Sequence, residues 1–520
     1  MKRFKGDESM NEEQREEQRE KFDARVQELI EGHFFGWEID KKNLPPELAR
    51  LFTPLAWNLL EWIPCGKADT VVEIGGHYGE YSARFADLAG ALYVYEADPR
   101  RAELVGLRCG GDGVRVFTDR FEDFLEALPG NVTRVVFHDI GFFGNVEALC
   151  TAMRTLRARY PDCLLILPCE NPNGLRFSLA GIEEPAALYP DRLLLSLDTL
   201  TALAQEAGCA ETAIYYPCPE TAAAMLLFSD RSLPKADQVV EYCLNKLADG
   251  FDRDSRAEFF ATKEAIAQGR FREKANSYLL LAGPLAELDL PVFVKYSNER
   301  ADFLKVRTEI RPGQWVRKIA VDKSGCAHIQ RLYRFVEHAR RQYAGTALTL
   351  PEASVTKYVY SYPFIEGKTL MQELDDALQK GRREFLDLLG RWQQQIRRAH
   401  DSSYFCKTRN FMRVFGNENV PAGLRCGDVN NIDLVFDNII LNGDDWVVID
   451  TEWTFDFPIP VDFILYRAFF YYAIRRELDK KLLASAWKLL GIDPELQAVF
   501  HKLELHFQAY ILGGNMRFLR

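Results

Sequence analysis

The chain has 520 residues, which at about 100–200 residues per domain predicts roughly two to four domains. Hydrophobic residues make up 47% and charged residues 27%, a balance that supports buried cores and excludes a largely disordered chain. The formal net charge of −11 gives no general basic field, so we expect no nucleic-acid partner. The cysteines form no C-x-x-C pair, which favours reduced thiols and a cytoplasmic location.

The chain offers no candidate for a transmembrane segment. Its most apolar late stretch, residues 459–474, is interrupted by Asp462 and Arg467 and is shorter than the roughly 20 residues that cross a bilayer. We therefore expect a cytoplasmic protein, with peripheral attachment to the inner face of the membrane as the alternative location.

Residues 11–30 are crowded with Glu, Gln, Arg and Lys, and the apolar residues among them recur at helical spacing. This pattern predicts an exposed helix within residues 1–35. A solvated surface helix is the main interpretation, and docking to a partner or homo-oligomerisation through this helix is the alternative.

From Thr70 onward, short apolar runs alternate with helical stretches, which predicts an α/β domain with a doubly wound parallel sheet over residues 36–235. The first run leads into Ile74-Gly-Gly-His-Tyr-Gly79, a turn at which glycine lets the backbone approach a ligand closely. The dinucleotide pattern G-x-G-x-x-G would need glycine at position 74, and isoleucine stands there, which argues against NAD.

The same turn resembles motif I of the class I methyltransferases that use S-adenosylmethionine, an acid followed by x-G-x-G-x-G. Glu73, Gly75 and Gly79 match that pattern, whereas His77 replaces the middle glycine. The resemblance covers about residues 57–230. It implies a Rossmann-like fold, S-adenosylmethionine as cofactor, and a role for the three matching residues in binding it.

Three acids that follow later strands complete the site that this resemblance implies. Glu96, after the second strand, is placed to accept hydrogen bonds from both ribose hydroxyls. Asp119 lies where the family often contacts the adenine amine, and Asp139 lies where the methyl acceptor approaches. For methyl transfer to oxygen, His77, His138 and Asp139 are the candidate bases, with core or capping roles as the alternative for the histidines.

A change of pattern marks a second domain. Residues 236–285 are charged and mostly helical, and we interpret them as a connector. Residues 286–520 are predicted to begin with three strands, continue with a helix over about 326–343, and then become mainly helical. The three strand candidates are residues 291–296, 304–310 and 315–321.

The strongest chemical signal lies in this second domain. Asp433 and Asn438 are five residues apart, as in the D-x-x-x-x-N of a kinase catalytic loop, and Asp450 follows twelve residues later. In phosphoryl transfer one carboxylate deprotonates the attacking hydroxyl, while an amide oxygen and a second carboxylate hold Mg²⁺. We therefore predict Asp433 as the base and Asn438 with Asp450 as metal ligands. Asp428, in Cys-Gly-Asp, is the rival base.

A lysine and a glutamate upstream fit the same chemistry. Lys318, on the third strand candidate, is expected to project toward the phosphates of ATP. Glu337, on the following helix, is expected to pair with that lysine and hold it for catalysis. A plain surface position on the strand is the alternative for Lys318.

Two loops complete the predicted nucleotide site. The loop at residues 296–302 contains no glycine, so Ser297 or Asn298 is expected to take the place of a glycine-rich phosphate loop. The hinge is expected at residues 359–367, whose strand edge would pair with adenine and which include the ATP-binding candidate Glu366.

Asn-Ile-Asp in the catalytic loop and the later Asp-Thr-Glu-Trp resemble the small-molecule kinases of the aminoglycoside and choline kinase type. This resemblance implies a bilobal protein-kinase-like (α+β) domain with ATP and Mg²⁺ as cofactors. A methyltransferase followed by such a kinase resembles bifunctional proteins of bacterial surface-polysaccharide (O-antigen) biosynthesis. By that resemblance the chain would phosphorylate and methylate a sugar or glycan terminus, with glycosyltransferases of a polysaccharide assembly complex as partners.

Two other interpretations stay open. The first is a kinase whose degenerate methyltransferase domain serves as a scaffold, and it is motivated by His77 and the missing glycine-rich loop. The second is a non-catalytic adaptor built from two pseudoenzyme domains. Binding of S-adenosylmethionine and of Mg²⁺-ATP separates the three interpretations.

Overall fold

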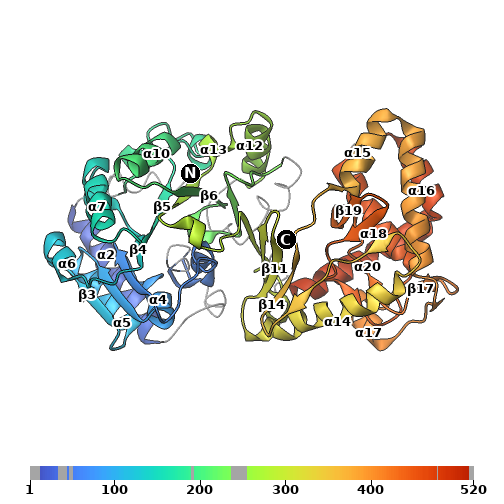
Figure 1. The fold of residues 1–520 in the computed structure, drawn as a ribbon, viewed down its shortest axis with the longest axis horizontal. Coiled ribbons are helices and arrows are strands. Elements are labelled where there is room, and N and C mark those ends of the chain that lie inside the picture. Colours follow the sequence, from blue (N-terminus) through green and yellow to red (C-terminus); the bar gives the residue numbers. More distant parts are fainter. Residues whose placement is uncertain are drawn as a thin grey trace. The chain divides into compact units, whose positions relative to one another are not determined.

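The computed structural model describes residues 12–32, 44–45, 48, 51–188, 192–235, 255–476 and 478–513. The chain divides into two compact units, residues 1–295 and 296–520 (Figure 1). Each unit has hydrophobic cores of its own. Within the described ranges, every helix is too short or too polar to cross a lipid bilayer. Residues 236–254 of the predicted connector lie outside these ranges.

The first unit is built on one large sheet. Its strands are β1 (Thr70–Ile74), β2 (Ala91–Tyr95), β3 (Val114–Phe117), β4 (Arg134–Phe137), β5 (Leu164–Glu170), β6 (Thr212–Cys218), β7 (Leu226–Ser229), β8 (Ser277–Ala282) and β9 (Phe293–Tyr296). Their order is β3-β2-β1-β4-β5-β8-β6-β7-β9, parallel from β3 to β5 and antiparallel beyond. Because β1 lies between β2 and β4, the ligand crevice of such a sheet is expected at its carboxyl end. The predicted Rossmann-like α/β fold is confirmed, and the predicted parallel pairing holds from β3 to β5.

Burial and capping explain why these segments form the predicted elements. All five residues of β1 are buried, as expected for a strand covered on both faces. Three helices begin at residues whose side chains accept backbone N–H groups: α5 (Pro99–Cys109) at Asp98, α7 (Val146–Arg159) at Asn145 and α10 (Leu197–Glu206) at Ser196. The unit also contains α4 (Ser82–Leu88), α6 (Phe121–Ala127), α8 (Leu175–Leu179), α9 (Pro185–Leu188), α12 (Ser255–Ala267) and α13 (Phe271–Lys274).

Strand β8 corrects the predicted domain organisation. All six of its residues are buried, and it pairs with β5 on one side and β6 on the other. The segment interpreted as a connector, residues 236–285, therefore includes a central strand of the first unit, and the sheet is mixed rather than wholly parallel. Ser-Tyr-Leu-Leu-Leu-Ala is a short apolar run without alternation, so its sequence pattern does not distinguish a buried strand from a buried helix.

Helix α2 (Glu12–Glu31) corrects a second expectation. Val26 and Leu29 are 0% and 2% exposed and pack in a cluster with Leu104 and Tyr78 of the same unit. The Tyr78 hydroxyl also donates a hydrogen bond to Asp23 Oδ1 at 2.7 Å. The helix is therefore amphipathic, with its apolar stripe covered inside the unit. The expectation of a solvated helix is wrong for this face. Because the apolar stripe is already covered within the unit, it is not available for oligomerisation.

The packing of α2 can be tested by substitution. Leu29→Ala is expected to lower the free energy of unfolding of the first unit by about 2–4 kcal/mol, because it leaves a cavity in the cluster against α5. Urea unfolding followed by tryptophan fluorescence measures this change. Glu28→Ala, at an exposed position of the same helix, should change the value by less than about 0.5 kcal/mol. Equal values for the two variants would contradict the packed helix.

The second unit begins with a small antiparallel sheet and one helix. The strands are β10 (Val306–Arg311), β11 (Trp315–Ala320), β13 (Ser354–Val355) and β14 (Val359–Pro363), in the order β10-β11-β14-β13, and the helix is α14 (Cys326–Gln342). Ile329, Leu332 and Val336 of α14 pack on this sheet. Burial alternates along β11, so Lys318 shares the inner face of the strand with Val316.

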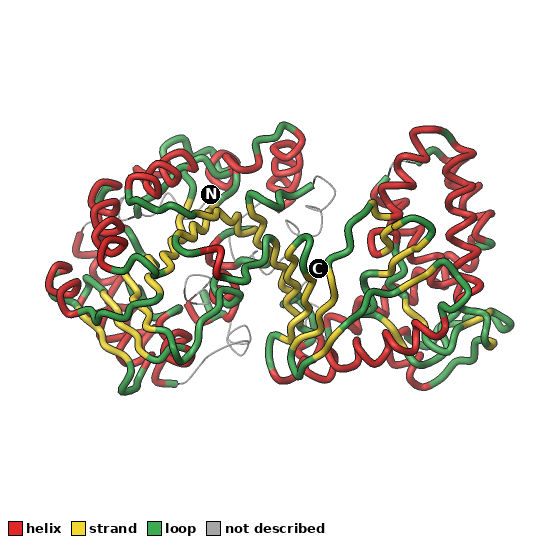
Figure 2. The backbone as a smooth tube through the Cα atoms, in the orientation of Figure 1, coloured by secondary structure: helices red, strands yellow, loops and turns green. Residues whose placement is uncertain are grey.

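The remainder of the second unit is mainly helical (Figure 2). Its helices are α15 (Leu370–Lys380), α16 (Arg382–Ala399), α17 (Arg409–Phe415), α18 (Val461–Arg475), α19 (Lys480–Leu490) and α20 (Pro494–Leu512). Its short strands are β12 (Leu348–Thr349), β15 (Lys368–Thr369), β16 (Ser403–Tyr404), β17 (Arg425–Cys426), β18 (Asn430–Asn431), β19 (Ile439–Asn442), β20 (Asp445–Val448) and β21 (Thr454–Phe455). The apolar stretch at residues 459–474 largely forms α18, most of whose side chains are buried in the hydrophobic core of the second unit.

Candidate functional sites

The turn between β1 and α4 adopts a backbone that favours glycine. Gly75 and Gly79 have φ angles of 76° and 80°, and a Cβ on Gly75 would lie 2.1 Å from the carbonyl oxygen of Asp139. His77 has a φ of 49°, which residues other than glycine adopt uncommonly. The backbone therefore explains the two predicted glycines, while His77 keeps its imidazole at a conformational cost.

Glu96 follows β2 and contacts this turn. One of its carboxylate oxygens accepts the His77 N–H at 2.7 Å, and the other accepts the Asp98 N–H at 3.0 Å. Burial raises the pKa of Glu96, although the hydrogen bond from His77 opposes that rise. The structure thus brings Glu96 to the glycine turn, and its contact with ribose stays a prediction.

Glu73 is completely buried at the end of β1. The Ser82 hydroxyl donates to one of its oxygens at 2.5 Å, and His138 Nδ1 lies 2.9 Å from the other. Burial would lower the pKa of His138, but the hydrogen bond with Glu73 and the negative charges of Glu80 and Glu73 outweigh burial and raise it. Glu73 therefore links the ends of β1 and β4 and orients the His138 ring.

The other two predicted acids are placed differently from each other. Asp139 accepts the Gly141 N–H at 3.0 Å, and its Oδ2 lies 3.8 Å from Arg101. Asp119 is exposed after β3, where its backbone carbonyl accepts the Tyr95 hydroxyl at 3.2 Å. The structure brings Asp139 to the turn and leaves the Asp119 side chain in solvent.

A cavity of about 560 Å³ lies beside the turn, within the usual size range of small-molecule sites. His77, His138 and Asp139 line it, together with Glu80 and Arg101, which sequence reasoning missed. Glu80 lies 2.7 Å from His77 Nδ1. Burial would raise the pKa of Glu80, but His77 and His138 hold it well below its usual range. No motif marks Glu80, and its place three residues after His77 is the available sequence signal.

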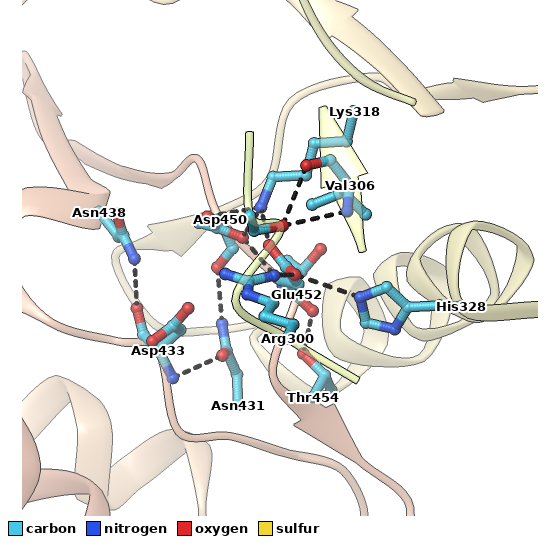
Figure 3. A network of polar contacts seen from close by, with 12 residues as sticks. Arg300, Val306, Lys318, His328, Asn431, Asp433, Asn438, Asp450, Glu452 and Thr454 are labelled. Atoms are coloured by element: carbon cyan, nitrogen blue, oxygen red, sulfur yellow. Dashed lines mark hydrogen bonds and ion pairs between the residues drawn. The ribbon is translucent and has the colours of Figure 1, made fainter. Parts of the chain in front are cut away.

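In the second unit, Lys318 lies in a buried ion-pair network (Figure 3). Its Nζ is 2.7 Å from Asp450 Oδ2 and 2.6 Å from Glu452 Oε2. Glu337, the predicted partner, pairs instead with Arg340, and its side chain is 50% exposed. The predicted Lys318–Glu337 pair is therefore wrong, as is the alternative of a surface lysine.

The register of α14 explains this correction. Val336, immediately before Glu337, is completely buried against the small sheet, so Glu337 is turned away from it. His328 is the α14 residue that enters the network, with Nε2 3.2 Å from Glu452 Oε1. The acid that holds Lys318 thus comes from the segment after β20 instead of from the helix.

Glu452 is the main functional candidate that sequence reasoning missed. It is 4% exposed and contacts Arg300 and Lys318 as well as His328. Burial would raise the pKa of Glu452, but the charges of Arg300 and Lys318 hold it well below the usual range. Its sequence signal was available in Asp-Thr-Glu-Trp, where it lies two residues after Asp450.

Because Glu452 pairs with Lys318 and Glu337 does not, substitutions of these two acids give a matched test. Glu452→Gln is expected to lower the free energy of unfolding of the second unit by about 3 kcal/mol, because it removes a buried negative charge that faces Lys318 and Arg300. Glu337→Gln removes an exposed pair and should cost less than about 1 kcal/mol. Denaturant unfolding of the two variants measures the difference, and a larger loss in Glu337→Gln would contradict the network.

Asn431 connects the two predicted catalytic acids. Its Oδ1 accepts the Asp433 N–H at 2.8 Å, and its Nδ2 donates to the Asp450 carbonyl at 3.0 Å. Asn438 Nδ2 donates to the Asp433 carbonyl at 3.0 Å, and Arg467 Nη1 donates to Asp433 Oδ1 at 2.6 Å. Burial raises the pKa of Asp433, although Arg467 opposes that rise. One network therefore joins four predicted residues of the phosphotransfer site, namely Lys318, Asp433, Asn438 and Asp450 (Figure 3).

Other predicted residues lie outside this network. Asp428, the rival base, is exposed and accepts a hydrogen bond from the Ser402 hydroxyl at 2.8 Å. The Ser297 hydroxyl donates to the Val306 carbonyl at 2.9 Å, so it holds the loop to β10. Asn298 is 2% exposed, and Glu366 is exposed after β14. The geometry favours Asp433 over Asp428, and contacts of Asn298 and Glu366 with nucleotide stay predictions.

No protein-family model matches this sequence, and no curated protein matches it. Solved structures that resemble part of the chain include a SAM-dependent methyltransferase from Archaeoglobus fulgidus, 14% identical over 46% of this chain and 93% of its own, with a TM-score of 0.29. Phosphoethanolamine N-methyltransferase 2 from Haemonchus contortus, in complex with S-adenosyl-L-methionine, is 13% identical over 44% of this chain and 51% of its own, with a TM-score of 0.29. The cyclopropane synthase MmaA2 from Mycobacterium tuberculosis is 14% identical over 44% of this chain and 82% of its own, with a TM-score of 0.28. These likenesses concern the fold alone.

Proposed function

We propose that this chain is a bifunctional transferase of surface-polysaccharide assembly. The second unit would transfer phosphate from Mg²⁺-ATP to a hydroxyl of a sugar or glycan terminus, and the first unit would methylate that terminus from S-adenosylmethionine. The observation that carries the proposal is the buried network joining Lys318, Asp450 and Asp433 through Asn431. Glycosyltransferases are the proposed partners, because the order of the two domains resembles that of bifunctional proteins of O-antigen biosynthesis.

Phosphoryl transfer depends on groups of the kind found in this network. Asp433, whose pKa is raised by burial, would accept the proton of the attacking hydroxyl. Asn438 donates through Nδ2, so its Oδ1 is the atom that would ligate Mg²⁺ with the Asp450 carboxylate. Lys318 would bind the nucleotide phosphates, and Glu452 would hold its ammonium in place.

The first unit supports methyl transfer through the glycine turn, Glu96 and the adjoining cavity. The turn lies at the carboxyl end of β1, where doubly wound sheets bind nucleotides. Glu96 is a buried carboxylate beside that turn, suited to hydrogen bonding with ribose hydroxyls. When bound, S-adenosylmethionine would supply the methyl group, and the residues of the chain would position it and the acceptor.

A second candidate function is favoured by one specific observation. His77 occupies a position with positive φ in the turn, where methyltransferase motif I has its middle glycine. If its ring blocks the cofactor, the first unit is a scaffold and the chain is a kinase alone. Binding of S-adenosylmethionine decides between the two candidates.

Release of ADP tests the phosphotransfer half directly. The purified chain with Mg²⁺-ATP should release ADP in the presence of an accepting saccharide from a panel of methyl glycosides and oligosaccharides. Asp450→Asn should abolish that release, because it weakens the metal site. Acceptor-dependent ADP release that persists in Asp450→Asn would contradict the proposed site. If the wild-type chain releases no ADP with any saccharide of the panel and also does not bind Mg²⁺-ATP, the adaptor interpretation is favoured.

A further inference from the structure

We infer that the first unit contains a divalent transition-metal site formed by His77, Glu80 and His138. One ring nitrogen of each histidine and one carboxylate oxygen of Glu80 lie within 4.8 Å of one another. In a tetrahedral site with bonds of about 2.0–2.2 Å, ligand atoms lie about 3.3–3.6 Å apart, so the most distant pair has to approach by up to about 1.5 Å. Two imidazoles and one carboxylate are a donor set that binds Zn²⁺, Co²⁺ or Fe²⁺ and leaves positions open.

The surroundings of His138 match those of a metal ligand. Its Nδ1 lies 2.9 Å from Glu73, a carboxylate that is itself completely buried and accepts a hydrogen bond from Ser82. A histidine that ligates metal usually donates its other ring N–H to such a carboxylate, which fixes the tautomer and the ring orientation. With Nδ1 committed to Glu73, Nε2 of His138 is the atom available to an ion.

The backbone at His77 is a second, independent observation. A residue other than glycine at a φ of 49° is conformationally costly, and glycine at that position would relieve the cost. The imidazole contacts Glu80 Oε1 through Nδ1 at 2.7 Å and lies against His138, with ring centroids 5.9 Å apart. The imidazole of His77, which the chain retains despite this backbone strain, is therefore one of the three groups of the proposed metal site.

The place of the cluster gives the ion a role. His77, Glu80 and His138 line the cavity of about 560 Å³ at the end of β1 and β4. An ion held there by three protein ligands would bind an oxygen of a ligand in the cavity and polarise it. This role rests on the proposed methyl transfer, whereas metal binding itself does not.

Cobalt spectroscopy of the full chain tests the site. Co²⁺ bound by two imidazoles and a carboxylate gives visible absorption bands, and titration of the wild-type chain should show one such site. His77→Gly should weaken this binding more than about 100-fold, since it removes a ligand while its backbone is compatible with the turn. Glu80→Gln should weaken it similarly. His501→Ala, a surface histidine on α20, should leave it unchanged.

The difference spectrum between wild type and His77→Gly removes contributions from other sites. A difference spectrum without bands, or bands in His77→Gly and Glu80→Gln that are as strong as those of the wild type, would overturn the metal site. Calorimetric titration with S-adenosylmethionine tests the proposed methyl transfer separately from the metal site. His77→Gly can be used in both experiments, because its backbone N–H at residue 77 can still donate to Glu96. Cofactor binding without a cobalt signal refutes the metal site alone, and a cobalt signal without cofactor binding refutes methyl transfer alone.

Discussion

Asp433→Asn is expected to lower kcat for phosphoryl transfer by roughly 10²–10⁴-fold, with little change in the affinity for Mg²⁺-ATP. Asparagine keeps the shape of the side chain and its backbone contacts with Asn431 and Asn438, but it cannot accept the proton of the attacking hydroxyl. Steady-state release of ADP with an accepting saccharide gives kcat, and binding of Mg²⁺-ATP by calorimetry gives the affinity.

Asp428→Asn is the matched control for this prediction. Asp428 is the other candidate base in the loop, but it is exposed and bonded to Ser402. Its substitution should change kcat by less than about threefold, since surface contacts of this kind contribute little. A large loss in Asp428→Asn with a small loss in Asp433→Asn would reverse the assignment of the base.

The pH dependence of the same reaction provides a second check on Asp433. A general base acts only when deprotonated, so kcat/KM should fall as the pH falls through the pKa of Asp433. Burial raises that pKa above the ordinary value of 3.8. The acidic limb of the profile should therefore lie above pH 3.8, and it should be missing from the residual activity of Asp433→Asn.

Glu96→Ala is expected to weaken the binding of S-adenosylmethionine by roughly 30-fold or more, about 2 kcal/mol. The carboxylate would accept charge-assisted hydrogen bonds from ribose hydroxyls, and it also fixes the His77 and Asp98 N–H groups of the turn. Calorimetric titration of wild type and variant with S-adenosylmethionine measures the effect.

Two companion variants separate cofactor binding from folding. Glu103→Ala removes an exposed acid of α5 that pairs with Arg100, and its affinity should match that of the wild type. Glu96→Gln keeps the size of the side chain and should bind with intermediate affinity. Wild-type binding that is equally tight in Glu96→Ala would place the cofactor elsewhere, and no binding in any of these proteins would make the first unit a scaffold.

Local sequence patterns were sufficient for much of the architecture. The buried run of β1 and the glycine turn after it follow from hydrophobicity and backbone sterics, which act between neighbouring residues. The spacing of Asp433, Asn438 and Asp450 predicted side chains that the structure brings into one network, because all three lie within a short segment around the hairpin of β19 and β20.

Other features were decided by contacts between distant segments. The run at residues 277–282 becomes a central strand only because it pairs with β5 and β6. In α14 each residue turns the side chain by about 100°, so the step from Val336 to Glu337 separates the buried face from solvent. The acid that pairs with Lys318 is therefore Glu452 instead of Glu337, and the helical pattern of α14 gives no sign of this difference.

The sequence alone determined the Rossmann-like pattern, the glycine turn and the spacing of the three residues Asp433, Asn438 and Asp450, since these depend on residues close together in the chain. Tertiary structure alone decided which acid holds Lys318 and which groups surround His138. It also decided that the apolar stripe of α2 is covered. The physical reason is the same in each case: side chains far apart in sequence meet only when strands and helices pack, and local periodicity does not specify their partners.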